Sequence, residues 1–275
     1  MIHRTRIAAL LAASTTVACA GGTGGSAAPA PAAPRPFEYA AGTATYRFIQ
    51  TSTTTQSMMG QSQDLASSGT RVVTLTLVRN SPDTMTLSAV LDSLTFQGPP
   101  GTPAPDFKPF VGKTVGAKLS PSGTVYSVTG PTEPAPLAAT VTDELGRMLP
   151  RIRGVLTPGH TWTDTLQDAP RQGPLELKRI AVTVYTVLAD TTMGAEAAWK
   201  IGRKTTTTIT GQGFQGTQIN FEGTGGATGT VWMSKLGVLL GGDVEDTLDG
   251  RATVPANGME IGVKTASSMK VMKVR

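Results

Sequence analysis

Few side chains in this sequence are of the kinds that enzymes use for nucleophilic or acid–base catalysis. The 275 residues include one cysteine, Cys19, and two histidines, His3 and His160. His160 could serve as a general base, but no Gly-x-Ser-x-Gly elbow accompanies it, and its place after Pro158-Gly159 is typical of a turn or a strand start. A lone histidine cannot form a multi-histidine metal site. We therefore predict no catalytic residue, no metal site and no cofactor.

Two glycine-containing motifs resemble nucleotide-binding loops but lack the surroundings that such loops need. Gly211-Gln212-Gly213-Phe214-Gln215-Gly216 has the letters of a dinucleotide fingerprint, which requires a strand that leads into a helix. Strand-like sequence lies on both sides of it, so we predict a glycine-rich hairpin turn. Gly112-Lys113-Thr114 resembles the end of a P-loop, but the leading glycine would fall on Phe107. No phosphate cradle is expected there.

Acidic residues are densest between Asp243 and Asp249, where Glu245 and Asp246 also lie. An EF-hand loop needs regularly spaced aspartates and a glutamate at its last position, and this stretch has neither. We interpret it as a solvated turn with an acidic strand edge, and a weak cation site is the alternative. A catalytic pair of carboxylates that only folding brings together stays open, because spatial pairs are invisible in sequence.

The N-terminal residues have the pattern of an export signal. Arg4 and Arg6 precede a short apolar run, Ile7–Ala13, and small residues follow it. The run is too short to span the roughly 30 Å hydrocarbon core of a bilayer as a helix. Thr16-Val17-Ala18-Cys19 resembles the lipobox of bacterial lipoproteins, although Thr16 stands where leucine is commoner. We predict a signal peptide at residues 1–18 and lipidation of Cys19; an ordinary signal with an incidental cysteine is the alternative.

The lipobox resemblance implies a division of the chain and a location for the protein. Residues 19–38 would be the lipidated cysteine and a tether, which begins rich in glycine and ends rich in alanine and proline. Residues 39–275 would form a single β-rich periplasmic domain. Ala20 follows the cysteine in place of the aspartate that signals inner-membrane retention. The expected location is therefore the cell envelope, anchored by lipid to the outer membrane and facing the periplasm.

The composition argues against a nucleic-acid partner. The formal net charge is +5, but lysine and arginine are scattered and form no run of about 5–8 basic residues. Aromatic residues make up only 5% of the chain, so each one is expected to pack. We interpret Trp162, Trp199 and Trp232 as core or rim residues, with a ligand-facing tryptophan as the alternative.

Alternation of apolar and polar residues predicts a mainly β fold of about a dozen strands. Leu91 and Leu94 lie on opposite parities of one such segment, which indicates a β-bulge between them. One helix is expected, because apolar residues recur at spacings of three and four from Leu137 to Leu149, before Pro150. The fold class that we predict is one large curved antiparallel sheet with this helix packed against it, after a disordered N-terminal signal and linker.

Several short segments resemble uncharacterised bacterial lipoproteins whose domain is similar to the LolA/LppX-type half-barrel. They are Val111–Thr114, Leu119–Val125, Val128–Gly130, Pro158–Asp164 and Gly229–Trp232. The resemblance implies a curved antiparallel sheet that wraps one or more helices and leaves an apolar cavity. Related members carry acyl chains or lipoproteins across the periplasm, and no catalytic residue transfers from them. LolA itself is soluble, so the lipobox departs from it, and half-barrels normally pack more than one helix.

The leading expectation is a lipid-anchored, non-catalytic periplasmic domain that binds an apolar ligand, such as a lipid or an acyl chain, or an envelope partner on the curved sheet. The expected partners are thus the membrane, through the N-terminal lipid, and that ligand or envelope protein. The alternative is a structural or interaction lipoprotein without a ligand pocket. A carboxylate hydrolase is a third hypothesis, which a close pair of carboxylates in a cleft would favour.

Overall fold

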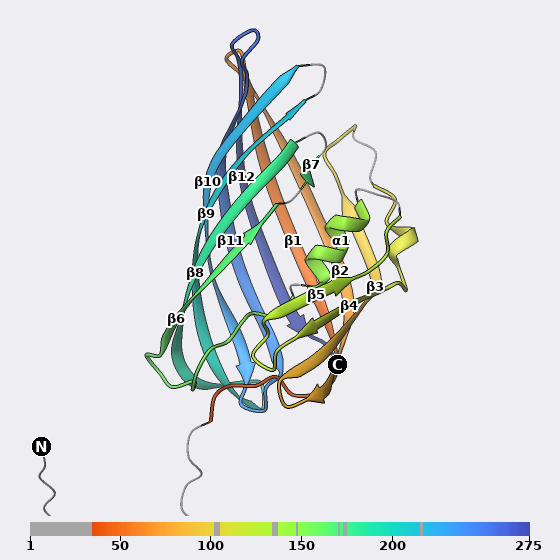
Figure 1. The fold of residues 1–275 in the computed structure, drawn as a ribbon, viewed down its shortest axis with the longest axis vertical. Coiled ribbons are helices and arrows are strands. Elements are labelled where there is room, and N and C mark those ends of the chain that lie inside the picture. Colours follow the sequence, from red (N-terminus) through yellow and green to blue (C-terminus); the bar gives the residue numbers. More distant parts are fainter. Residues whose placement is uncertain are drawn as a thin grey trace, which may run out of the picture. The chain divides into compact units, whose positions relative to one another are not determined.

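One antiparallel β-sheet makes up most of the chain that the structure describes (Figure 1). The structure is a computed structural model and describes residues 35–101, 105–133, 137–146, 148–169, 171–172, 175–214 and 217–275. These residues belong to one unit that runs from Arg35 to Arg275. The predicted signal at residues 1–18, the predicted lipidation site Cys19 and the tether up to residue 34 lie outside the described residues.

The described residues contain twelve strands, one α-helix and one short 3-10 helix. The strands are β1 (Gly42–Met58), β2 (Gln61–Ser81), β3 (Thr84–Gln97), β4 (Thr114–Leu119), β5 (Val125–Thr129), β6 (Thr161–Asp168), β7 (Arg171–Gln172), β8 (Leu175–Met193), β9 (Glu196–Phe214), β10 (Gln218–Ser234), β11 (Leu239–Val254) and β12 (Met259–Lys273). The 3-10 helix η1 spans Lys108–Phe110, and α1 spans Leu137–Gly146.

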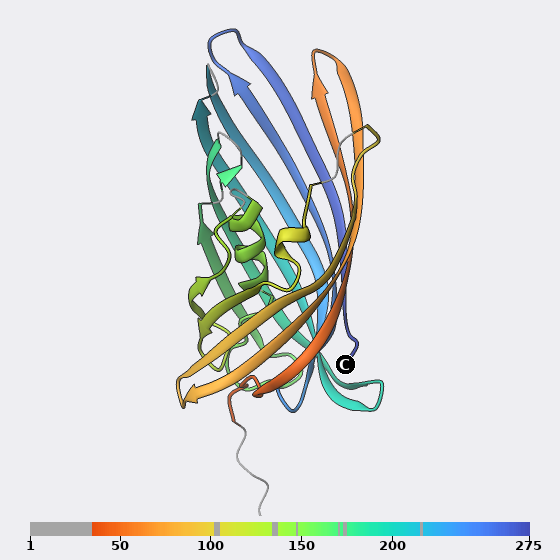
Figure 2. The same cartoon turned by 90° about the vertical axis from the view of Figure 1, so that its right-hand side faces the viewer.

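The strands follow the order β5-β4-β3-β2-β1-β12-β11-β10-β9-β8-β6, and β7 pairs with β8 beside this path. All neighbouring strands are antiparallel. In the described chain β5 and β6 are the two edges and do not pair, so the sheet is open. The predicted mainly β class and the large antiparallel sheet are confirmed. The sheet is strongly curved, and α1 and η1 lie on its inner side (Figure 2).

Side chains alternate between the two faces of this sheet as the period-two pattern requires. On β9, Ile201 and Thr205 are buried on the inner face, whereas Lys204, Thr206 and Thr208 are exposed on the outer face. Threonine suits both places, because it is β-branched and its hydroxyl can bond across strands. The inner face carries the core, whose largest fully buried side chains include Tyr39, Met85, Leu87, Phe110 and Ile152.

A β-bulge interrupts the register between β2 and β3. Val72 pairs with Ser93, but the next residue, Val73, pairs with Leu91, which leaves Asp92 as the extra residue. The bulge predicted from the change of parity is confirmed. Because of it, Leu91 and Leu94 both face the inner side of the sheet, although they lie on opposite parities.

Glycines line part of the inner face of β10. Gly225 and Gly229 share the parity of Val231, which is buried in the core. A Cβ atom at Gly225 would collide with the carbonyl oxygen of Thr247, and one at Gly229 with that of Asp243. On the concave side neighbouring backbones converge, so a residue without a side chain permits the curvature.

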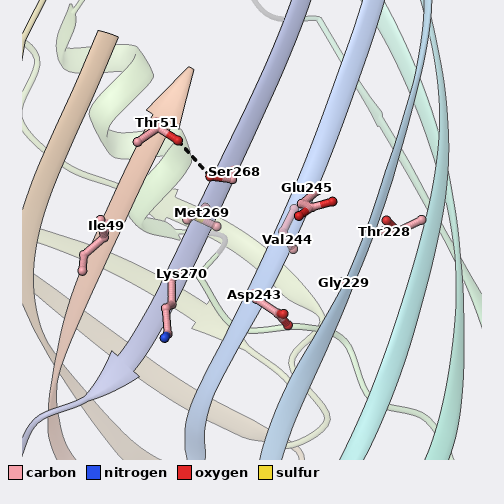
Figure 3. Close-up of a pocket in the computed structure, with 10 residues that line it drawn as sticks. All are labelled: Ile49, Thr51, Thr228, Gly229, Asp243, Val244, Glu245, Ser268, Met269 and Lys270. Atoms are coloured by element: carbon pink, nitrogen blue, oxygen red, sulfur yellow. Dashed lines mark hydrogen bonds between the residues drawn. The ribbon is translucent and has the colours of Figure 1, made fainter. Parts of the chain in front are cut away.

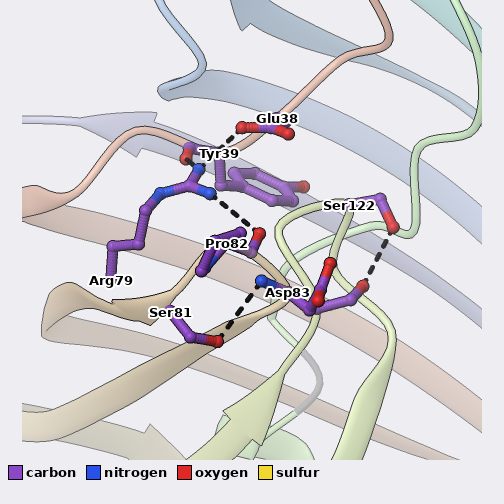
Figure 4. A network of polar contacts seen from close by, with 8 residues as sticks. Glu38, Tyr39, Arg79, Ser81, Pro82, Asp83 and Ser122 are labelled. Atoms are coloured by element: carbon purple, nitrogen blue, oxygen red, sulfur yellow. Dashed lines mark hydrogen bonds and ion pairs between the residues drawn. The ribbon is translucent and has the colours of Figure 1, made fainter.

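The N-terminal segment bonds to the loops and to β2 at the end of the sheet where it enters (Figure 4). Tyr39 is only 1% exposed, and its hydroxyl donates to the carbonyl oxygen of Pro150 at 2.6 Å. Arg79 of β2 binds the carboxylate of Glu38 at 2.8 Å and donates to the carbonyl oxygen of Pro82 at 3.3 Å. We call this the closed end; the turns between β1 and β2 and between β11 and β12 lie at the opposite end (Figure 1).

Candidate functional site

A pocket of about 230 Å³ lies on the inner face, between β1 to β3 on one side and α1 on the other. Its walls are mainly apolar and come from Phe48, Leu91, Leu94, Phe96, Phe107 and Leu145. Engineered cavities of about 150 Å³ with such walls already bind small apolar molecules. The pocket falls somewhat below the roughly 300 Å³ at which sites for drug-sized ligands begin, so it suits one chain rather than a bulky lipid.

The β-bulge at Asp92 makes this pocket. Leu94 pairs with Arg71 and Phe96 pairs with Gly69, while Leu91 pairs with Val73. Without the extra residue, strict alternation would turn either Leu91 or the pair Leu94 and Phe96 towards the outer face. The bulge therefore gathers three apolar side chains of one strand around the same space.

Two aromatic rings form the rim of the pocket. Phe96 and Phe107 meet edge to face, with their ring centroids 6.0 Å apart. Phe96 is 39% exposed, which is unusual for an aromatic residue on the inner face of this sheet. Burial of this ring under an apolar ligand would remove further apolar surface from water and so favour binding.

One ion pair joins the sheet to α1 across the pocket wall. Nη1 of Arg71 on β2 lies 2.7 Å from Oε1 of Glu144 on α1. The Arg71 side chain is 13% exposed, and its guanidinium carbon lies 4.9 Å from the centroid of the Phe48 ring. Glu144 is 46% exposed. The pocket thus combines an apolar interior with one largely buried cation.

A larger hollow of about 370 Å³ lies on the outer face, over β1, β12, β11 and β10 (Figure 3). Polar and charged side chains make up much of its lining, and some of them bond to their neighbours: the hydroxyls of Thr51 and Ser268 are 2.9 Å apart, and Asp243 accepts a hydrogen bond from the backbone nitrogen of Thr230 at 3.0 Å. In Figure 3 the helix lies behind the sheet, on the opposite side from these residues. The outer hollow therefore belongs to the solvated face, and the inner pocket is the candidate site.

The structure places His160 in a packed position beside the closed end. The Nε2 atom of His160 lies 2.9 Å from the carbonyl oxygen of Arg153, and its ring stacks on Trp162 at 5.6 Å. Trp162 in turn stacks on Tyr185 at 5.0 Å and donates to the carbonyl oxygen of Arg151. These stacked rings and hydrogen bonds pack the segment before β6 against the sheet. The prediction that His160 follows a turn is confirmed.

The glycine motif and the acidic stretch both differ from their predicted turns. Gly211 and Gly213 lie within β9 and pair with Leu177 and Leu175 of β8, so the strand runs further into the motif than predicted. The predicted hairpin itself is confirmed, because β9 and β10 pair antiparallel from Phe214 and Gln218 onwards. Residues 215 and 216 of the motif lie outside the described residues. The acidic stretch from 243 to 249 lies in the middle of β11 rather than in a turn. Both differences arose because the strands continue past the glycines and charges that usually end them.

Alternation along β11 separates the acidic side chains. Asp243, Glu245 and Asp249 are exposed, while Asp246 is half-buried and accepts a hydrogen bond from Ser267. Lys264 pairs with Asp249 at 3.2 Å. In the described part of the chain, no three His, Cys, Asp or Glu side chains come together as a set of metal ligands.

The tryptophans pack as the sequence analysis expected. Trp162 is 8% exposed and belongs to the core, and Trp199 packs against the core. Trp232 is half-buried, with Nζ of Lys200 at 5.7 Å from its ring centroid.

Gly112-Lys113-Thr114 lies at the start of β4, where Gly112 has a positive φ of 78° in a turn.

Arg71 is the residue of the candidate site that sequence reasoning missed. It shares its parity with Val73 and Leu75, which are core residues, and this signal was present in the sequence. A cation on the apolar face of a strand is unusual unless it has a partner. The partner, Glu144, is far away in sequence and only the fold brings it near.

Among the described residues, none of the helices has the length and apolar character that crossing a bilayer requires. No protein-family model matches the chain, and comparison with curated proteins also gives no match.

Proposed function

We propose that this protein is a non-catalytic, lipid-anchored domain of the cell envelope that binds an apolar chain, of the lipid or acyl type, in the pocket on the inner face of its sheet. The observation that supports the proposal most is the pocket beside α1, with its apolar walls and its exposed aromatic rim at Phe96. The anchor at Cys19 and the location at the outer membrane are parts of the same proposal and come from the sequence.

The arrangement of sheet and helix also supports a half-barrel of the LolA/LppX type. The sheet is open and curved, and α1 lies on its inner side, with Ala138 and Leu145 in the core (Figure 2). This is the architecture that the resemblance implies, and it leaves a pocket where the sheet and the helix diverge. The catalytic alternatives gain no support from the pocket: the described residues that line it include one carboxylate, Glu144, and no histidine.

The test is binding of a neutral fluorescent hydrophobic probe, N-phenyl-1-naphthylamine, to the full-length protein in detergent-free buffer, with displacement by 1-dodecanol. Ser67 lines the pocket, and Ser268 lines the hollow on the outer face. We expect Ser67→Phe to fill the pocket and to weaken probe binding at least about tenfold, which corresponds to about 1.4 kcal/mol. The matched control Ser268→Phe should bind the probe as the wild type does.

A structural or interaction module is the second candidate function, and the two sheet edges favour it. In the described chain β5 and β6 each lack a strand on their outer side, and Tyr126 on β5 is 60% exposed. Unpaired edges can add a strand from a partner. Absence of probe binding to the wild type, with the fold intact by circular dichroism, would favour this candidate over ligand binding.

A further inference from the structure

The guanidinium of Arg71 has more hydrogen-bond donors than its surroundings use. An arginine side chain carries five N–H groups in a rigid fork. Nη1 donates to one oxygen of Glu144, and Nη2 donates to the sulfur of Met269, 3.8 Å away, which is a weak acceptor. Nε is buried and has no hydrogen-bond partner among the described residues. The group is therefore under-satisfied for a charge that is largely removed from water.

Arg71 is itself one of the residues that line the pocket. Arg71 pairs with Phe48 on β1 and Leu94 on β3, and all three residues line the pocket. Its charge lies over the Phe48 ring, where a cation is held in place. Among the described residues that line the pocket, the only other charged one is Glu144. Glu144 is half exposed and contacts a single nitrogen of Arg71. Water therefore screens the electrostatic attraction between the two side chains.

The geometry points to an acidic amphiphile as the ligand: an apolar chain that ends in a carboxylate or a phosphate. This inference rests on the proposed binding of an apolar chain and specifies its head group. The chain would lie among Leu94, Phe96, Phe107 and Leu145, and the anionic group would accept hydrogen bonds from the fork of Arg71. Arginine matches both carboxylate and phosphate geometry with two parallel bonds, whereas an alcohol can accept only singly and carries no charge.

Glu144 would compete with such a ligand, because it already takes one donor of the same guanidinium. Its removal should therefore strengthen the binding of an anion relative to that of a neutral chain. A purely structural role of the Arg71–Glu144 pair predicts the contrary result, since loss of either partner would then loosen α1 and weaken all ligands alike. The two variants thus separate recognition from packing.

The experiment measures displacement of N-phenyl-1-naphthylamine from the full-length protein by 1-dodecanol, dodecanoate and dodecyl phosphate at about pH 7.5, where the acids are ionised. For the wild type we expect the better of the two anions to bind about tenfold or more tightly than the alcohol, the effect of a hydrogen bond to a charged group. Arg71→Gln should abolish this preference while dodecanol still binds. Glu144→Gln should raise anion affinity about two- to fivefold.

Arg251→Gln is the matched control, because Arg251 is a paired arginine on the outer face, with Glu222 at 2.5 Å and Glu260 at 3.5 Å. It should leave all three affinities unchanged. A preference for dodecanoate indicates a fatty-acid-like ligand, and one for dodecyl phosphate a phospholipid-like ligand; either supports the inference. Equal affinities for alcohol and anions, unchanged in Arg71→Gln, overturn the inference but leave chain binding intact. Failure of every compound to displace a probe, or of the probe to bind, removes both proposals.

Discussion

Two buried tyrosine hydroxyls stabilise the closed end of the molecule through hydrogen bonds to backbone carbonyl groups. Tyr46 on β1 donates to the carbonyl oxygen of Leu239 at 2.9 Å, and Tyr39 donates to that of Pro150 at 2.6 Å. Each bond joins segments that are more than a hundred residues apart in sequence. The aromatic rings fill the core, and the hydroxyls satisfy carbonyl groups that have left water.

Tyr46→Phe should destabilise the protein by about 1–3 kcal/mol, because it leaves the buried carbonyl oxygen of Leu239 without this donor. The free energy of unfolding, measured by urea denaturation at neutral pH, checks the prediction. The matched control is Tyr126→Phe on β5, where the side chain is 60% exposed; the change there should stay within about 0.5 kcal/mol. Equal effects of the two substitutions would contradict the role assigned to the buried hydroxyl.

Stability should fall at alkaline pH through three buried tyrosines. Desolvation by burial raises the pKa of Tyr39, Tyr46 and Tyr185, and Glu196 raises that of Tyr46 further. The unfolded chain releases these protons near pH 10, before the folded chain does. Their contribution is therefore fully present below about pH 10 and is lost as the pH rises above it, by up to about 1.4 kcal/mol per pH unit for each tyrosine.

Urea midpoints between about pH 8 and pH 11 check this prediction, together with the ultraviolet absorbance of the phenolate. Tyr46→Phe should make the alkaline decline shallower, because it removes one of the raised groups. A decline that begins well below pH 10, or ionisation of all tyrosines without unfolding, would contradict the assignment.

Curvature is the property that matters at the scale of the elements. The strands from β8 to β12 are 15–19 residues long, and a flat sheet of such strands would have no hollow. Glycines on the inner face of β10 let the backbones of β10 and β11 approach closely. The bulge in β3 then shapes the wall that carries the pocket.

Two adjacent glycines of β10 allow a matched test of this role. A Cβ atom at Gly225 would collide with the backbone of Thr247, whereas one at Gly226 would meet only the carbonyl oxygen of Thr205, at an ordinary 3.4 Å. Gly225→Ala should therefore destabilise the fold by about 1–3 kcal/mol. Gly226→Ala should be neutral or slightly stabilising, because it restricts the unfolded chain. Urea unfolding of both variants gives the comparison, and a reversed order would refute the argument.

For the whole molecule, the proposed anchor and the proposed pocket make separate predictions. A cysteine with two or more acyl chains holds a protein stably on a membrane, whereas a bare N-terminus does not. The pocket is formed by residues of the Arg35–Arg275 unit alone, so chain binding should not depend on the anchor.

Cys19→Ser should abolish incorporation of labelled palmitate and release the full-length protein from the membrane fraction of a host that processes bacterial lipoproteins. Thr16→Leu is the control: it restores the commoner lipobox residue, so labelling should persist. Retained label in Cys19→Ser would place the acyl group elsewhere, and absent label in the wild type would remove the anchor from the proposed function.

The sequence alone determined the class of the fold, because alternation of apolar and polar residues is a local property that each strand displays by itself. It also located the bulge between Leu91 and Leu94, since a change of parity is visible without knowledge of the partner strand. It failed where a strand runs through residues that usually end one, at Gly211 and at the acidic stretch of β11. Pairing with two long neighbours outweighs local preference there.

Only the tertiary structure decided where the pocket lies and what charge it holds. Arg71 and Glu144 are 73 positions apart in sequence, and the paired residues of β1 and β12 are up to more than 200 positions apart. No periodicity within one segment encodes such distances. The pocket exists because the open sheet curves around α1 and the bulge at Asp92 turns three apolar side chains of β3 towards the space between them.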